Sequence, residues 1–122
     1  ELIDVLQRTR QPFNLNSIAQ AGALAGLLDD EHQAKTKRIT DEGRAYLQKQ
    51  FGELGLEYIP SYANFVLVKV GDGNTVFKAM MDQGVIVRAM AAYKLPEWVR
   101  ISIGTMPQNE RCIEVLKQVL GK

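Results

Sequence analysis

Two arginines stand in segments whose other residues are almost all apolar. Arg88 ends a run that starts at Val85, and Arg100 lies within a run that ends at Ile103. A charge is costly in apolar strands, and Pro96 between the two runs indicates a loop. Two strands joined by one loop most simply form an antiparallel hairpin, which places the two guanidiniums side by side. Because like charges across a ladder repel, the pair predicts an anion bound between them.

Strand alternation sets the direction in which Arg100 points. It would share a face of the sheet with Trp98 and Ser102. Arginine presents a planar fork of donors that matches a carboxylate or a phosphate. The alternative is that Arg88 or Arg100 forms a salt bridge with an aspartate or glutamate of the same domain. No acidic residue occurs between positions 84 and 95, so local partners are scarce.

Composition excludes several classes of protein. The 122 residues are one domain's worth, and 46% of them are hydrophobic. With 15 basic and 14 acidic residues the formal net charge is +1, so no global field would attract nucleic acid or a membrane surface. The longest apolar run, residues 21–28, is too short to span a bilayer. The single cysteine, Cys112, excludes an internal disulfide and fits a reducing compartment such as the cytoplasm.

Other residues of catalytic type have structural explanations. His32 lies in a charged helix start without partners at metal-ligand spacing, so we expect a surface role and no metal site. Cys112 lies next to Ile113 on the last predicted helix, which is typical of a core position. The segment from Gly71 to Gly73 lacks the glycine spacing of a dinucleotide site and indicates a turn.

The pattern along the chain predicts long helices first and a small sheet afterwards. Helices are predicted over 1–9, from Asn14 or Asn16 to 28, over about 30–54, from 76 to Gly84, and from Pro107 onward; strands are predicted over 63–68, 84–88 and 98–104. The second half therefore has the order β-α-β-β-α. We interpret this as an α/β chain in an α+β arrangement, with a small, mainly antiparallel sheet covered by helices.

Four motifs, in this order, resemble the C-terminal part of histidinol-phosphate aminotransferases. They are RQPFNLNS from Arg10, PSYANFVLV from Pro60, GVIVRAMAAYKLP from Gly84 and VRISIGT from Val99. The resemblance implies a fold type I enzyme that uses pyridoxal 5′-phosphate. It implies that residues 1–14 are the end of a large domain or a linker, and that residues 15–122 are the small C-terminal domain.

The resemblance also implies an activity and partners. The full-length enzyme would transfer an amino group between histidinol phosphate and glutamate or 2-oxoglutarate in histidine biosynthesis, as a cytoplasmic homodimer. Arg100 matches the family's small-domain arginine, which receives the carboxylate or phosphate of the substrate, and Arg88 matches a second phosphate contact. Asn64 and Tyr93 match motif positions that we expect to be structural.

This sequence departs from the family pattern at several positions, none of which is an arginine of the pair. Ala89 stands where proline is frequent, Lys94 where glycine is common, and residues 106–108 where acidic side chains are usual. The Schiff-base lysine of the family lies upstream, in the large domain. The resemblance therefore implies no catalytic and no cofactor-binding residue in this chain, which begins at Glu1 like a piece of a longer protein and is expected to be inactive alone.

Two alternatives stay open at this stage. Relatives of the same fold decarboxylate threonine phosphate or act on aromatic amino acids, and the two arginines favour a phosphate-bearing substrate over a plain carboxylate. The second alternative is a free-standing α+β module that binds small anions or RNA. Its strand face would need aromatic or basic residues, and Trp98 is the only aromatic in the predicted arginine strands.

Overall fold

The computed structural model describes residues 1–12 and 14–122, so Phe13 of the first motif lies outside the described residues. The chain divides into two compact units, residues 1–35 and residues 36–122. The domain boundary after residue 14, which the resemblance implies, stays a prediction. No helix in the described part of the chain is long and apolar enough to cross a membrane.

The first unit consists of helices whose apolar side chains lie on the surface. Helix α1 spans Leu2–Thr9 and α2 spans Ser17–Leu27, as predicted. Asn16 caps α2, because its side chain accepts a hydrogen bond of 2.8 Å from the backbone N–H of Ala19. Among the described residues of this unit, the large apolar side chains are all more than half exposed: Leu2, Ile3, Val5, Leu6, Leu15, Ile18, Leu24, Leu27 and Leu28.

Helix α3 spans Asp30–Glu53 and forms one wall of the core of the second unit. Leu47 and Phe51 on its buried face are fully buried. The helix ends at Glu53, one residue before the predicted Leu54. Gly55 has the predicted left-handed φ, 66°, and the N–H of Leu56 donates to the carbonyl of Phe51 at 2.9 Å.

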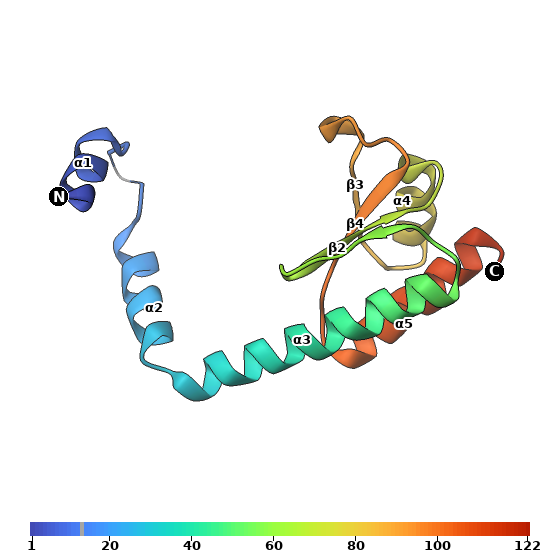
Figure 1. Ribbon diagram of the computed structural model, residues 1–122, viewed down its shortest axis with the longest axis horizontal. Coiled ribbons are helices and arrows are strands. Elements are labelled where there is room, and N and C mark those ends of the chain that lie inside the picture. Colours follow the sequence, from blue (N-terminus) through green and yellow to red (C-terminus); the bar gives the residue numbers. More distant parts are fainter. Residues whose placement is uncertain (13) are drawn as a thin grey trace. The chain divides into compact units, whose positions relative to one another are not determined.

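The second unit is a four-stranded antiparallel sheet with helices on one face (Figure 1). The strands are β1 Tyr58–Ile59, β2 Phe65–Lys69, β3 Arg88–Ala89 and β4 Trp98–Ser102, in the order β1-β2-β4-β3. Helices α4 (Gly73–Asp82) and α5 (Met106–Leu120) complete the core with α3. The predicted fold class is confirmed, and strand β1 is an addition to it.

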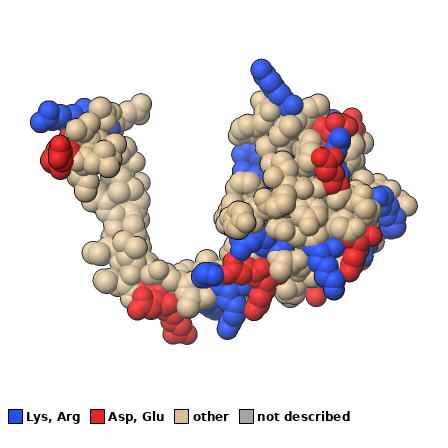
Figure 2. Space-filling view, in the orientation of Figure 1, with Lys and Arg blue, Asp and Glu red and all other residues tan. Residues whose placement is uncertain are grey.

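The inward side chains of β2 and β4 share one apolar core with the three helices. Val66, Val68, Val99 and Ile101 are buried against α3, α4 and α5. The opposite side chains of these strands are half-buried or exposed, so one face of the sheet is left open. In Figure 2, basic and acidic side chains are intermixed over the visible face of residues 36–122 rather than gathered by sign.

Two predicted strands are longer than the observed ones. The strand expected over 84–88 is wrong except at Arg88, because the N–H of Val85 bonds to the carbonyl of Met80 at 3.0 Å and ties this segment to α4. The strand expected over 98–104 ends at Ser102. Beyond it, the backbone N–H and C=O of Gly104 pair with the side chain of Asn109 instead of continuing the ladder.

The predicted turn at 71–73 is the start of α4. Gly71 has a φ of 89°, and the Asp72 side chain accepts hydrogen bonds from the N–H groups of Asn74 and Thr75. These bonds hold the pKa of the Asp72 carboxyl below its usual value, and the bond from Thr75 has the largest effect.

Candidate substrate-anion site

The two arginines lie directly opposite each other in the sheet. In the β3–β4 ladder Arg88 pairs with Arg100. Two residues along, the N–H of Met90 donates to the carbonyl of Trp98 at 3.1 Å. Because hydrogen-bonded and non-hydrogen-bonded pairs alternate along an antiparallel ladder, Arg88 and Arg100 form a hydrogen-bonded pair. The Cα atoms of such a pair lie about 5.5 Å apart. The prediction that neighbouring antiparallel strands bring the two arginines side by side is confirmed.

Arg100 projects from the open face of the sheet, as alternation along the strand predicts. Its neighbours Val99 and Ile101 are 0% and 2% exposed on the core side. The Cζ of Arg100 lies 5.0 Å from the centre of the Phe65 ring. Its Nε is buried and has no hydrogen-bond partner among the described residues. A buried donor without a partner is uncommon and indicates a place where a ligand or further residues supply an acceptor.

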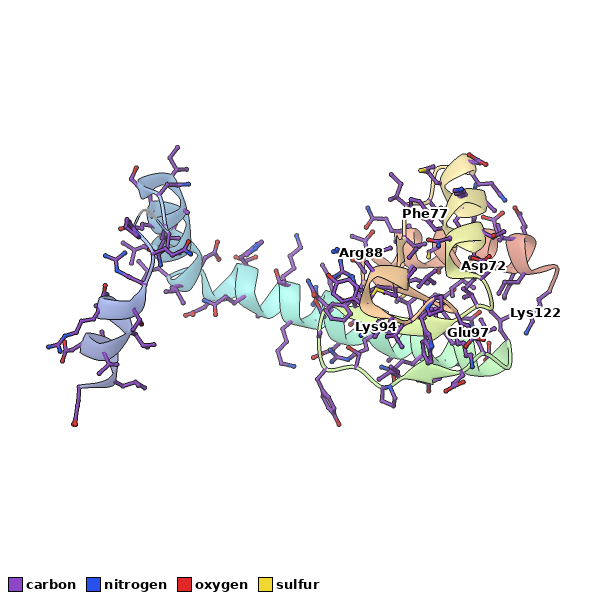
Figure 3. The ribbon with its side chains drawn as sticks, turned by 90° about the horizontal axis from the view of Figure 1, so that it is seen from above. Asp72, Phe77, Arg88, Lys94, Glu97 and Lys122 are labelled. Carbon is purple, nitrogen blue, oxygen red and sulfur yellow. The ribbon has the colours of Figure 1, made fainter. Side chains whose placement is uncertain are left out.

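Arg88 is exposed and is held by Tyr93 in the turn that follows β3. The turn is the short helix η1, Ala91–Tyr93. The Cζ of Arg88 lies 5.4 Å from the centre of the Tyr93 ring, and its Nη2 donates a hydrogen bond of 3.2 Å to the Tyr93 hydroxyl. Figure 3 shows Arg88 and Lys94 at this end of the sheet. Lys94, which follows Tyr93, has a left-handed φ of 62°.

Neither arginine is neutralised within the described part of the chain. No carboxylate described lies within 4.0 Å of either guanidinium, so the alternative of an internal salt bridge is wrong for these residues. The acidic residue closest in sequence to the pair, Glu97, contacts Lys69 at 3.4 Å. Two uncompensated cations on one sheet face make the local potential positive, although the chain as a whole is nearly neutral.

The two motif residues expected to be structural behave differently. The carbonyl of Asn64 accepts the N–H of Ile103 at 2.8 Å and extends the pairing of β2 with β4. Tyr93 contacts Arg88 directly. Phe65 belongs to the second motif, and its ring lies beneath Arg100. Alternation could have placed Phe65 on the arginine face, but the diagonal contact depends on side-chain conformation.

An apolar hollow lies over β1 and β2 on the same open face, next to the strand that carries Arg100. It has a volume of about 370 Å³ and is lined by residues 59–63 together with Phe65 and Leu67. Leu67 pairs with Arg100 and Ile59 pairs with Leu67, so an apolar surface runs across the sheet up to the guanidinium. A ligand with an anionic end and a less polar body would meet both surfaces at once.

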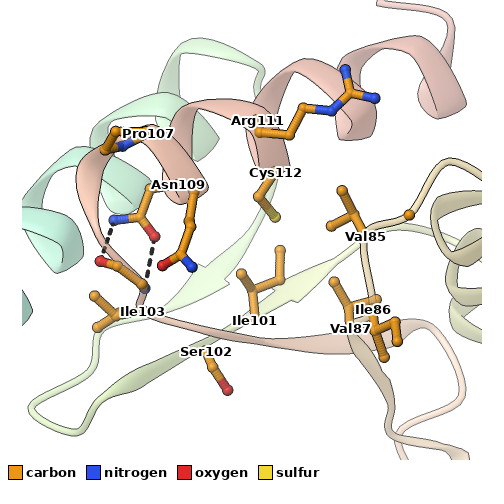
Figure 4. Close-up of a pocket in the computed structure, with 13 residues that line it drawn as sticks. Val85, Ile86, Val87, Ile101, Ser102, Ile103, Pro107, Asn109, Arg111 and Cys112 are labelled. Atoms are coloured by element: carbon orange, nitrogen blue, oxygen red, sulfur yellow. Dashed lines mark hydrogen bonds between the residues drawn. The ribbon is translucent and has the colours of Figure 1, made fainter.

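A second pocket lies apart from the arginines, between residues 84–87 and the start of α5 (Figure 4). Its volume is about 480 Å³, and neither arginine lines it. Cys112 lies on its wall and is only 7% exposed. Burial raises the pKa of the Cys112 thiol to about 11, so the thiol stays protonated and unreactive near neutral pH. The prediction of a core cysteine is confirmed.

The fold is shared with pyridoxal-phosphate enzymes. A structure of histidinol-phosphate aminotransferase from Sinorhizobium meliloti in complex with pyridoxal 5′-phosphate superposes with a TM-score of 0.79 at 23% identity, over 96% of this chain and 33% of that one. An L-threonine-O-3-phosphate decarboxylase from Porphyromonas gingivalis superposes with a TM-score of 0.76 at 21% identity, over 95% of this chain and 38% of that one. These likenesses show the class of fold, that of fold type I enzymes, and they cover 33% and 38% of the two other chains.

Sequence similarity then defines the family. The model of aminotransferase class I and II matches residues 1–116, and the chain belongs to this family. It is 55% identical to a histidinol-phosphate aminotransferase of Akkermansia muciniphila, over 95% of this chain and 32% of that protein. It is 48% identical to a histidinol-phosphate aminotransferase of Ralstonia nicotianae, over 100% of this chain and 34% of that protein. The chain thus spans about a third of the length of these relatives.

Proposed function

We propose that this chain is the small C-terminal domain of a histidinol-phosphate aminotransferase, and that Arg88 and Arg100 bind the anionic group of its substrate. The observation that carries the proposal is the direct pairing of the two arginines without a described carboxylate partner. Relatives that are 55% and 48% identical to this chain are histidinol-phosphate aminotransferases, and this similarity supports the proposed substrate.

Pyridoxal 5′-phosphate, when bound, supplies the electron sink that amino transfer requires. The residues of this chain do not fit the role of cofactor anchor. None of its lysines is buried, and Lys69 is held between Glu57 at 3.7 Å and Glu97 at 3.4 Å. We propose that the cofactor-binding lysine lies in the part of the relatives' length that this chain does not cover.

The role of the present residues follows from their chemistry. Two guanidiniums on neighbouring strands donate several hydrogen bonds to a phosphate, and the fork of Arg100 also matches a carboxylate. Anchoring the anion fixes the end of the substrate remote from its amine, which orients the reacting carbon. The same two arginines would serve histidinol phosphate and the amino acceptor in turn, by their phosphate and carboxylate groups. Homodimeric assembly and a cytoplasmic location belong to this proposal.

A substrate panel on the full-length protein tests the function. We expect amino transfer from histidinol phosphate to 2-oxoglutarate to exceed that from phenylalanine in kcat/KM. Faster reaction of phenylalanine would make the protein an aromatic aminotransferase. Release of carbon dioxide from threonine phosphate would make it a decarboxylase, an alternative that the shared fold keeps open. Either result would overturn the proposed substrate, whereas binding of an anion without turnover would favour a regulatory module.

A further inference from the structure

Each arginine of the pair lies on an aromatic ring, and the two rings reach the pair from different elements. Phe65, under Arg100, belongs to β2 and pairs with Ser102. Tyr93, under Arg88, belongs to η1 and follows the end of β3 that lies near Trp98. The two rings therefore support the guanidiniums from opposite ends of the β3–β4 pair.

The two aromatic rings offset the energetic cost of placing the two arginines together. Two guanidiniums opposite each other in a ladder repel, and long arginine side chains would otherwise adopt many conformations. The face of an aromatic ring attracts a cation, more strongly where water is excluded. Arg100 has the more shielded environment, because its Nε is buried while Arg88 is exposed. The Tyr93 hydroxyl adds one directed hydrogen bond, which fixes the orientation of the Arg88 fork.

We propose that Phe65 and Tyr93 are positioning residues: their rings hold Arg100 and Arg88 in place so that both can meet one phosphate group. The proposal rests on the proposed function and deepens it. Preorganisation matters here because ordering a flexible side chain on binding costs affinity. The ring under the more shielded arginine should have the larger effect.

Substitutions in the full-length enzyme distinguish the contribution of each aromatic ring from that of the Tyr93 hydroxyl. Phe65→Leu and Tyr93→Leu remove a ring, Tyr93→Phe removes only the hydroxyl, and Phe65→Tyr restores a ring. The control is Tyr58→Leu, which removes a ring from the core side of the sheet, where Tyr58 packs on Phe51 at 6.1 Å between ring centres. Thermal unfolding checks that each variant is folded. Tyr93 is 56% exposed, so the loss of its ring removes little buried apolar surface.

Two readouts are measured: the inhibition constant of inorganic phosphate, and kcat and KM for histidinol phosphate. We expect Phe65→Leu to raise the phosphate inhibition constant and KM about tenfold, and Tyr93→Leu about threefold. Tyr93→Phe should raise them about twofold, and kcat should stay within about twofold in all variants because the ring does not touch the reacting atoms. Phe65→Tyr should match the wild type, and Tyr58→Leu should lower the unfolding temperature only.

A double-mutant cycle distinguishes an effect of Tyr93 through Arg88 from a general effect of Tyr93 on the structure. If Tyr93 acts through Arg88, Tyr93→Leu should have no further effect on phosphate inhibition once Arg88→Ala is present. An undiminished effect in that background, or ring variants indistinguishable from Tyr58→Leu, would overturn the positioning proposal alone. A wild-type enzyme that neither prefers histidinol phosphate nor is inhibited by phosphate would overturn the proposed function, and this proposal with it.

Discussion

Replacing Arg100 with alanine should abolish most substrate recognition without unfolding the protein. Arg100 is half-buried, its Nε has no described partner, and its guanidinium lies over Phe65. A ligand phosphate bound there would lose its charge-assisted hydrogen bonds and keep a partly desolvated charge. Loss of one partner of such a pair costs about 2–4 kcal/mol. This corresponds to a decrease of about 30- to 800-fold in kcat/KM.

The effect on stability should be small, because opposing contributions nearly cancel. At roughly 6–8 Å and an effective dielectric constant of about 20–80, repulsion between the guanidiniums is about 0.5–3 kcal/mol, and alanine removes it. Alanine also removes the contact with Phe65, which contributes about 0.5–2 kcal/mol. The free energy of unfolding should therefore change by no more than about 1–2 kcal/mol in either direction.

The assay compares two amino donors in the full-length enzyme: histidinol phosphate and histidinol, which lacks the phosphate. We expect Arg100→Ala to lower kcat/KM for the phosphorylated donor far more than for histidinol. Arg88→Ala should show the same selectivity with a smaller loss, of about 5- to 30-fold, because Arg88 is exposed. Arg111→Ala is the matched control, since Arg111 pairs with Glu114 on α5 and does not belong to the site.

Three results would refute this reasoning. A loss below tenfold for Arg100→Ala would mean that Arg100 is not a main anion contact. An equal loss with histidinol would mean that the substitution disturbs the whole active site rather than the phosphate end. A large drop in the unfolding temperature would show that Arg100 supports the sheet and that the repulsion is already relieved.

Three further substitutions test the surrounding structure. Asn109→Ala should lower the free energy of unfolding in urea by about 2–4 kcal/mol, because it leaves the backbone N–H and C=O of Gly104 without their hydrogen-bond partner. Lys94→Gly should raise it by about 0.5–1 kcal/mol, since Lys94 has a left-handed φ of 62°. Because the pKa of Asp72 is lowered on folding, the wild type should unfold at a higher temperature than Asp72→Ala above about pH 4. That advantage should disappear as the pH falls through the lowered pKa.

The sequence predicted those helices and strands whose pattern of apolar residues extends over several residues. Helices α3 and α5 have long apolar stripes, and β2 and β4 alternate or run apolar for five residues, so their positions follow from periodicity. Strand β1 has only two residues, Tyr58 and Ile59, which is too short for any pattern to mark. Strand β3 is equally short, because the preceding residues satisfy their backbone at the end of α4.

The candidate site was predictable as far as backbone pairing determines it. Facing positions on neighbouring strands follow from a hairpin, so the arginine pair could be found from residue types and one proline. The contacts of Phe65 and Tyr93 could not be found in this way, because they depend on side-chain conformation across a third strand and a turn. The hydrogen bonds of Asn109 could not be predicted from the sequence either, because their partner, Gly104, is five residues away and was expected to lie in a strand.

The proposed anion site on the open face depends on packing on the buried face. A slip of one residue between β3 and β4 would turn Arg88 into the core and expose Val87, which is only 7% exposed. The start of β4 is held independently, since a Cβ on Gly73 would lie 2.5 Å from the carbonyl oxygen of Trp98 and α4 therefore packs directly on this strand. Because the core selects the register, the repulsion between Arg88 and Arg100 is offset by burial of valines on the other face. The sheet can thus hold two cations together before any anion arrives.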